Sequence, residues 1–127
     1  MELYNLTQSV ILFLRQPLAQ VNLGGMYDIG KGVTQDYSEA LKWYRKAAEQ
    51  GHASAQFYLG AKYANGQGVA RDYVSSHMWI NLAVSRASGE DPKEFAKARD
   101  TVAGKMSPRQ IADAQKLARD WKPITKK

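Results

Sequence analysis

The chain has 127 residues, with 18 Lys and Arg against 12 Asp and Glu, and a formal net charge of +6. It contains no cysteine, which excludes disulfide bonds, thiolate metal sites and cysteine nucleophiles. Apolar residues make up 44% of the chain, as in a globular protein with a buried core. The basic excess is modest and forms no long run, so we expect a solvated surface and no nucleic-acid partner.

The first sixteen residues contain a short apolar run from Val10 to Leu14. Five residues are far fewer than the roughly 20 needed to cross a bilayer, so we expect no membrane span. No positively charged segment precedes the run and no small-residue cleavage site follows it, so a signal peptide is not expected. The compartment stays open between the cytoplasm and the periplasm.

The next segment predicts a helix that ends at a glycine. Ala19, Leu23 and Tyr27 recur at i, i+4 and i+8, which places them on one helical stripe. Gly24 lies beside that stripe, where glycine costs about 1 kcal/mol relative to alanine, so we expect another element to approach closely there. Gly30 is expected to end the helix in the left-handed conformation.

A second helix is expected to follow the loop that contains Gly32. Asp36 stands in the position of an N-cap, with Glu39 at the capping-box spacing three residues later. The alanines and aromatic residues around Trp43 form a wide apolar stripe, as in a helix packed between two neighbours. Gly51 ends this helix, so the unit is a pair of antiparallel helices.

The same pattern returns 36 residues later, since Ala55 to Ala83 repeats Ala19 to Ala47 (55 minus 19). Twelve positions are identical in the two copies, without a gap. They include the pairs Gly24/Gly60, Gly30/Gly66, Gly32/Gly68 and Trp43/Trp79. A period of this length indicates a helical array in which each unit buries its apolar face against its neighbours. We therefore expect the two tryptophans to be buried equivalents.

The first copy, AQxxLGxxYxxGxGVxxDYxxAxxWYxxAAxxG, resembles the Sel-one-like repeat (SLR), a branch of the tetratricopeptide-like helical repeats. The second copy keeps Asp72 and Trp79 but departs from the pattern at Ser76, His77 and Ala87. The resemblance implies an all-α fold, a short right-handed α-solenoid of helix-turn-helix repeats. It also implies a role in protein–protein interaction, with no catalysis and no cofactor. Many bacterial members end in a segment similar to QIADAQKLARDW near the end of this chain.

We interpret the chain as one solenoid domain, with repeats at 19–54 and 55–90. A shift of 36 residues carries the second helix of the first repeat onto the N-terminal segment, so residues 1–16 are interpreted as a degenerate N-terminal helix. That helix is expected to cover the helix of Ala19–Ile29 or to pair with a second copy of the chain. The residues proposed for self-association are Val10, Ile11, Phe13 and Leu14.

Residues 91–121 are expected to form a two-helix C-terminal cap. Asp91-Pro92 and Ser107-Pro108 both combine an N-cap residue with a proline at the first helical position. The expected buried stripes are Phe95, Ala98, Val102 and Met106 in the first helix, and Ile111, Ala114, Leu117, Ala118 and Trp121 in the second. Pro123 ends the last helix, and residues 124–127 are expected to fray.

No residue pattern indicates chemistry. His52 and His77 have no His, Cys or carboxylate at i+3 or i+4, so no metal site is expected. The Gly-x-Gly pairs follow helices rather than strands, which excludes a phosphate loop. Ser76 and His77 are adjacent on a helix, without a nucleophile elbow, so we expect no hydrolase. We predict no catalytic, cofactor-binding or metal-binding residue, and a protein that is not an enzyme.

The remaining candidate is a surface. By the resemblance, the first helix of each repeat lines a concave face on which a peptide or helix of a partner protein can lie. The positions on this face are Val21, Gly25, Asp28, Phe57, Ala61, Ala64 and Asn65. Alternatively, these positions face residues 1–16 or a second copy, and the chain is an assembly unit that self-associates through its N-terminal helix. The sequence does not identify the partner.

Overall fold

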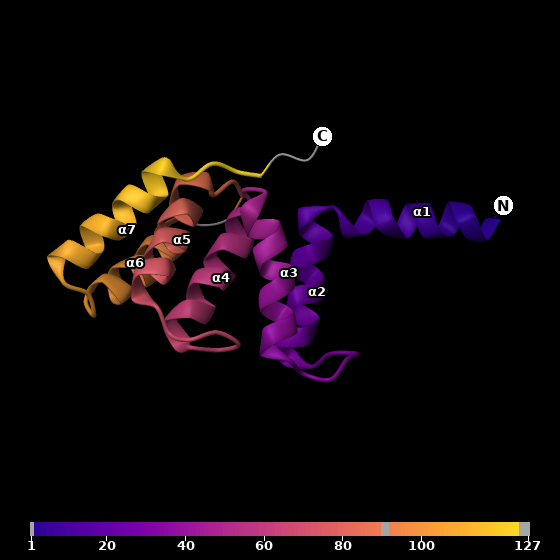
Figure 1. The fold of residues 1–127 in the computed structure, drawn as a ribbon, viewed down its shortest axis with the longest axis horizontal. Coiled ribbons are helices and arrows are strands. Elements are labelled where there is room, and N and C mark those ends of the chain that lie inside the picture. Colours follow the sequence, from indigo (N-terminus) through magenta and orange to yellow (C-terminus); the bar gives the residue numbers. More distant parts are fainter. Residues whose placement is uncertain (1, 90–91, 125–127) are drawn as a thin grey trace.

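A computed structural model describes residues 2–89 and 92–124, with side chains from residue 5 onward. These residues form seven α-helices and no strand (Figure 1), so the predicted all-α class is confirmed. In chain order the helices are α1 (Glu2–Leu14), α2 (Pro17–Ile29), α3 (Tyr37–Glu49), α4 (Ala53–Asn65), α5 (Tyr73–Arg86), α6 (Pro92–Ala103) and α7 (Pro108–Asp120). From α2 to α5 each helix packs on the next, and both α6 and α7 pack on α5.

The helices begin where the sequence places capping residues. The Asp36 carboxylate accepts a hydrogen bond from the Glu39 amide at 3.1 Å, and Asp72 caps α5 in the same way. Ser107 and Gln110 form a reciprocal capping box at the start of α7, with bonds of 3.1 and 2.8 Å. These N-caps are confirmed, whereas the N-cap expected at Asp91 lies outside the described residues.

Glycines set the spacing between helices, as expected. A Cβ on Gly24 would lie 2.6 Å from the Tyr44 ring of α3, so α3 can pack this closely only because the position has no side chain. The equivalent Cβ on Gly60 would lie 2.6 Å from Ile80 and 3.0 Å from the Ser76 carbonyl oxygen of α5. The predicted reason for glycine inside these helices is therefore confirmed.

The two repeat tryptophans are not equally buried, which corrects the expectation. Trp79 is 5% exposed and belongs to the core between α3, α4 and α5, whereas Trp43 is only half-buried. The difference has a local cause. Trp121, which follows α7, meets Trp79 edge-on with 5.9 Å between ring centroids. Trp43 has no such partner from the equivalent position, because the residue one repeat before Trp121 is Ser85. Trp43 instead lies beneath the Lys46 ammonium, 4.4 Å from its ring centroid.

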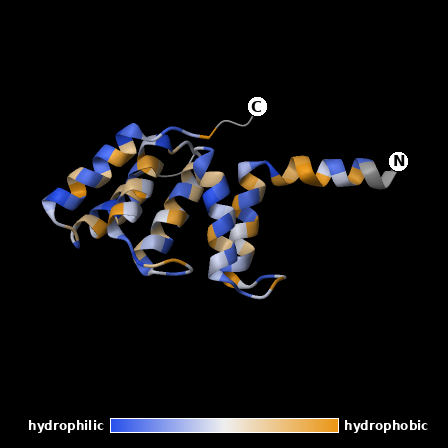
Figure 2. Cartoon of the chain, in the orientation of Figure 1, coloured by the Kyte–Doolittle hydropathy of each residue, from blue (hydrophilic) through white to orange (hydrophobic). Residues whose placement is uncertain are grey.

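Residues 5–14 form the predicted N-terminal helix but do not cover α2. Figure 1 shows α1 projecting from the body, and Figure 2 shows its apolar residues on that projection. Leu6, Val10 and Phe13 are 62%, 55% and 61% exposed, and Leu14 at the base is half-buried. The expectation that this helix packs along α2 is wrong, because the turn at its base directs it outward.

The C-terminal segment returns to the first repeat. After α7 it passes the Trp79 core, and the Ile124 amide donates to the Glu49 carbonyl oxygen at the end of α3, at 2.8 Å (Figure 1). Ile124 is therefore bonded rather than frayed, which corrects the expectation for that residue. The residues of the two apolar stripes expected in α6 and α7 contact the core or are half-buried. The exception is Leu117, which is 49% exposed. Residues 125–127 lie outside the described part of the chain.

Candidate protein-binding surface

A hollow of about 430 Å³ opens between α2 and α4. Most of its wall comes from α2, and one tyrosine each from α3 and α4 completes it. The lining residues are Val21, Asn22, Gly25, Met26, Asp28, Ile29, Lys31, Tyr44 and Tyr58. The rings of Tyr44 and Tyr58 lie 5.2 Å apart between centroids, so one side of the hollow is aromatic.

Gly25 keeps this hollow open. A Cβ at this position would meet only the Tyr44 hydroxyl, at 3.9 Å, so there is room for a side chain that would occupy the hollow. Gly24, one residue earlier, is closed off by the Tyr44 ring. The adjacent glycines therefore do different work: Gly24 lets α3 pack on α2, and Gly25 leaves the surface hollowed.

Asp28 at the edge of the hollow is held by both neighbouring helices. Its carboxylate forms an ion pair with the buried Lys62 ammonium of α4 and accepts a 3.1 Å hydrogen bond from the Tyr44 hydroxyl of α3. Lys62 also donates to Gln67 at 3.0 Å and lies over the Tyr37 ring. Burial, the nearby Asp28 charge and the hydrogen bond to it raise the pKa of Tyr44 above its ordinary value. The carboxylate is thus compensated, and the hollow presents mainly apolar and aromatic surface.

The structure gathers only some of the concave positions named from the sequence. Val21, Gly25 and Asp28 line the hollow. Phe57 stacks on Phe95 of α6, with 4.7 Å between ring centroids. The remaining positions lie elsewhere on α4: Ala61 is half-buried, Ala64 packs in the core beside α6, and Asn65 is exposed.

The corresponding space one repeat further on is filled. Phe57 and Ala61 stand 36 residues after Val21 and Gly25, so they mark the equivalent positions on α4. There the stacked rings of Phe57 and Phe95 occupy the gap toward α6. The open hollow therefore belongs to the first repeat, with most of its wall on α2.

Comparison with known proteins identifies the repeats. Residues 17–52 and 53–88 each match the Sel1 repeat family, beginning at the first residues of α2 and α4. The chain belongs to the Sel1 repeat family. This Sel1 repeat chain is similar to a protective antigen from uropathogenic Escherichia coli that displays an SLR fold, with 37% identity and a TM-score of 0.77. It is also similar to a Sel1 repeat protein from Oxalobacter formigenes, with 36% identity and a TM-score of 0.60.

The matches cover different shares of each protein. The E. coli match includes 84% of this chain but 22% of that protein, and the O. formigenes match includes 65% of this chain and 62% of that protein. No curated protein matches the chain. The resemblance stated from the sequence and the helical-repeat solenoid are confirmed. Sel1 repeats are generally protein–protein interaction scaffolds, and their fold is typically non-enzymatic.

The sequence did not indicate all residues of the hollow in this Sel1 repeat chain. Asn22 and Tyr58 occupy equivalent positions 36 residues apart, and both lie at the hollow. The equivalence of these two positions in the repeat could have identified both residues from the sequence. The Asp28–Lys62 pair had no such signal, because the residue equivalent to Lys62 in the first repeat is Met26.

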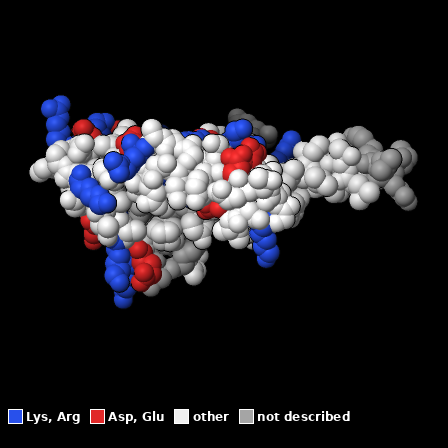
Figure 3. All heavy atoms as spheres, turned by 90° about the horizontal axis from the view of Figure 1, so that it is seen from below, with Lys and Arg blue, Asp and Glu red and all other residues white. Residues whose placement is uncertain are grey.

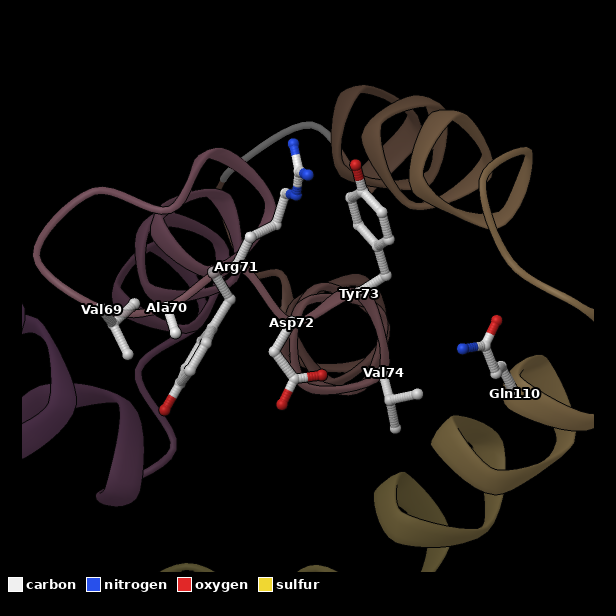
Figure 4. A pocket seen from close by; sticks show the side chains of 8 residues that line it. Val69, Ala70, Arg71, Asp72, Tyr73, Val74 and Gln110 are labelled. Carbon is white, nitrogen blue, oxygen red and sulfur yellow. The ribbon is translucent and has the colours of Figure 1, made fainter.

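A second hollow of about 490 Å³ lies between the start of α5, the loop before it and the start of α7. Figure 4 shows Arg71 and Tyr73 pointing to one side, Asp72 and Val74 to the other, and Gln110 across from Val74. These polar groups already have structural partners. Asp72 accepts from the Ser75 amide and hydroxyl, Gln110 completes the α7 capping box, and the Arg71 guanidinium lies over the Tyr73 ring.

Neither the charged residues nor the potential metal ligands indicate another site in the described residues. No group of three or more His, Cys, Asp or Glu residues is placed there to hold a metal ion. His52 caps α4, accepting from the Ala55 amide at 3.3 Å, and His77 is buried in α5. Figure 3 shows basic and acidic side chains interspersed over the body and none on the described part of α1. No helix among these residues is long and apolar enough to cross a membrane.

Proposed function

We propose that this chain is a non-enzymatic scaffold that binds a peptide or helix of a partner protein on the face lined by α2 and α4. The observation that supports the proposal is the open hollow at Val21, Gly25 and Asp28, whose counterpart beside Phe57 is filled. Its volume falls within the roughly 300–1,000 Å³ typical of ligand pockets. The partner segment would continue from the hollow along α4, past the half-buried Ala61 toward the exposed Asn65.

The lining favours an apolar partner segment. Lys62 and Tyr44 already compensate the Asp28 carboxylate, so a cationic side chain would compete with an existing ion pair. The rings of Tyr44 and Tyr58 instead offer a flat apolar contact, of the kind that contributes strongly at protein interfaces. The exposed Lys31 at the edge would suit an acidic residue that flanks the apolar anchor.

A substitution at Gly25 tests this proposal without opening the fold. Gly25→Gln would occupy the hollow, and it should not weaken α2 because glycine is the poorer helix former. Ala112→Gln, at an exposed position of α7, is the matched control. Peptides selected from a displayed random library against the wild-type chain would be titrated against both variants by fluorescence anisotropy.

We expect Gly25→Gln to weaken binding at least tenfold and Ala112→Gln to leave it unchanged. Unfolding curves of both variants should match or exceed that of the wild type. If the peptides bind Gly25→Gln as tightly as the wild type, the hollow is not the binding site. A library that yields no binder would also contradict the proposal.

A second candidate function is assembly through α1. The observation that favours it is the exposure of Leu6, Val10 and Phe13 on a helix that the body does not cover. Contiguous exposed apolar surface usually marks an association site. In this reading Val10, Ile11, Phe13 and Leu14 form an association surface, and the chain is an assembly unit.

A further inference from the structure

Three of the exposed apolar residues of α1 lie on one stripe, which can contact one other helix. Leu6, Val10 and Phe13 follow each other at intervals of four and three residues, which places them on a single stripe. Spacing of this kind forms the narrow apolar seam of paired helices. Ser9 flanks the seam, the exposed Ile11 and Leu12 lie outside it, and no charged residue occurs from Asn5 to Leu14.

The turn between α1 and α2 explains why this seam is left uncovered. The α3–α4 turn contains Gly51 with φ of +96°, a conformation that residues other than glycine rarely adopt. One repeat earlier the same position is Arg15, and no described residue other than glycine has positive φ. The α1–α2 turn therefore follows a different path from the α3–α4 turn.

Hydrogen bonds fix the base of the projecting helix. The Gln20 side-chain amide donates to the Leu14 carbonyl oxygen at 2.8 Å, and its own oxygen accepts from the Gln50 amide at 2.8 Å. Gln20 is buried, so these bonds are partly shielded from water. The last turn of α1 is thus tied to both α2 and α3, and the seam is presented in one direction.

The charge distribution favours a second copy of the chain as the occupant of the seam. Each copy carries a net charge of +6, so two bodies repel each other at short range. The uncharged stretch of α1 lets two copies meet without bringing cations together. Arg15 follows directly after α1, and a parallel pair would bring the two Arg15 residues and the two bodies side by side. An antiparallel pair places them at opposite ends.

We infer that two copies of this chain pair through their α1 helices in antiparallel orientation, with Leu6, Val10 and Phe13 of each copy forming the seam. This rests on the proposed self-association through α1 and adds the residues of the seam and the direction of the pair. Such a pair is a closed two-fold dimer, in which the same surface serves both copies. The hollow beside α2 stays outside the seam, so the dimer is bivalent for the partner segment.

The size of the interface sets the expected strength. Two 13-residue helices give a contact roughly 20 Å long. The area buried in so short a contact is smaller than the roughly 1,600 Å² of a standard interface. We therefore expect a weak dimer, largely dissociated at low micromolar concentration and associated at several hundred micromolar. Sedimentation equilibrium over that range measures the association directly.

Two variants and a control locate the contact. Leu6→Ala/Val10→Ala/Phe13→Ala removes the seam while favouring helix, because alanine is the best helix former, and Val10→Glu/Phe13→Glu adds repulsion. Leu117→Glu changes an exposed leucine of α7 and should leave the dimer intact. We expect at least a tenfold weaker association for both α1 variants, with helical circular dichroism retained. A wild-type chain that stays monomeric at several hundred micromolar overturns the inference, and binding to neutral lipid vesicles would not rescue it. A dimer that neither α1 variant weakens also overturns it.

Spin labels distinguish the orientation, since the chain has no cysteine of its own. Single cysteines at Ser9 and Gln16, labelled in separate samples, give the distance between the two copies by pulsed electron resonance. An antiparallel pair should show a short distance at Ser9 and a clearly longer one at Gln16, because the two Gln16 positions are then roughly 20 Å apart along the helix axis. Short distances at both positions would overturn the antiparallel inference, while α1 would remain an association surface.

Discussion

The two repeats of this chain share their pattern but not their surroundings. The second repeat is enclosed, with α3 on one side and α6 and α7 on the other, and its Trp79 meets Trp121. The first repeat has no comparable cover on its N-terminal side in the described residues: α1 projects away, Trp43 is half-buried and the hollow stays open. Equivalent residues therefore contribute differently, because the energy of a repeat lies in the interfaces with its neighbours.

The largest expected difference is between the two tryptophans. Trp79→Ala should lower the free energy of unfolding by about 3–5 kcal/mol, as for large aromatic residues in cores. Trp43→Ala should cost less, about 1–2 kcal/mol, because part of that ring already contacts water. Urea denaturation of the two variants measures both values, and equal losses would show that the repeats are energetically alike.

The loop glycines give the next largest difference. Gly32 and Gly68 both have positive φ, at 78° and 79°, so alanine at either position costs about 1–2 kcal/mol in backbone strain. A Cβ on Gly68 would also lie 2.6 Å from the Tyr37 carbonyl oxygen, whereas one on Gly32 would meet only Met26, at 3.5 Å. Gly68→Ala should therefore cost about 3 kcal/mol in total, since overpacking adds about 1–3 kcal/mol.

The control for this pair is the single substitution Gly32→Ala, measured by the same urea denaturation. A loss at Gly32 as large as that at Gly68 would contradict the view that only the second loop is packed against a neighbouring repeat.

The smallest expected effect concerns His77, which stands where the first repeat has Leu41. Both are buried, and the His77 Nδ1 atom has no hydrogen-bond partner. Burial and the nearby Arg99 guanidinium lower the pKa of His77, and the Asp100 carboxylate acts in the opposite sense. The unfolded chain therefore binds a proton more readily, so stability should fall as the pH drops below about 6.5.

His77→Leu should remove this pH dependence and stabilise the fold by about 1 kcal/mol at pH 7.5, because an unpaired buried polar atom is lost. The advantage over the wild type should widen toward pH 5.5. Unfolding free energies at both pH values measure it, and a constant difference would show that His77 keeps its ordinary affinity for protons in the folded state.

Residues inside the repeat could be read from the sequence, whereas contacts from outside it could not. Helix starts at Asp36 and Asp72, and the close approaches at Gly24 and Gly60, depend on local pattern and on register, and both were predicted. The unequal burial of Trp43 and Trp79 depends on Trp121, which lies outside the repeat.

The candidate site shows the same limit. Val21, Gly25 and Asp28 were predicted from the resemblance to helical-repeat arrays, but whether the space beside them is open depends on the helix that packs next. In the second repeat Phe95 of α6 fills the equivalent space. Phe95 lies outside the repeats, so the 36-residue period does not predict its position. The direction of α1 accompanies a different turn sequence, in which Arg15 stands where the α3–α4 turn has Gly51.

Native-state hydrogen exchange of the dilute chain tests most directly whether the array is closed around the second repeat and open at its N-terminal end. Amides of α4 and α5 should exchange slowest, near the limit set by global unfolding. Amides of α1 should exchange within about a hundredfold of an unstructured peptide, because a helix of this length is marginal without packing. Protection of α1 equal to that of α4 and α5, at concentrations where the chain is monomeric, would contradict the account.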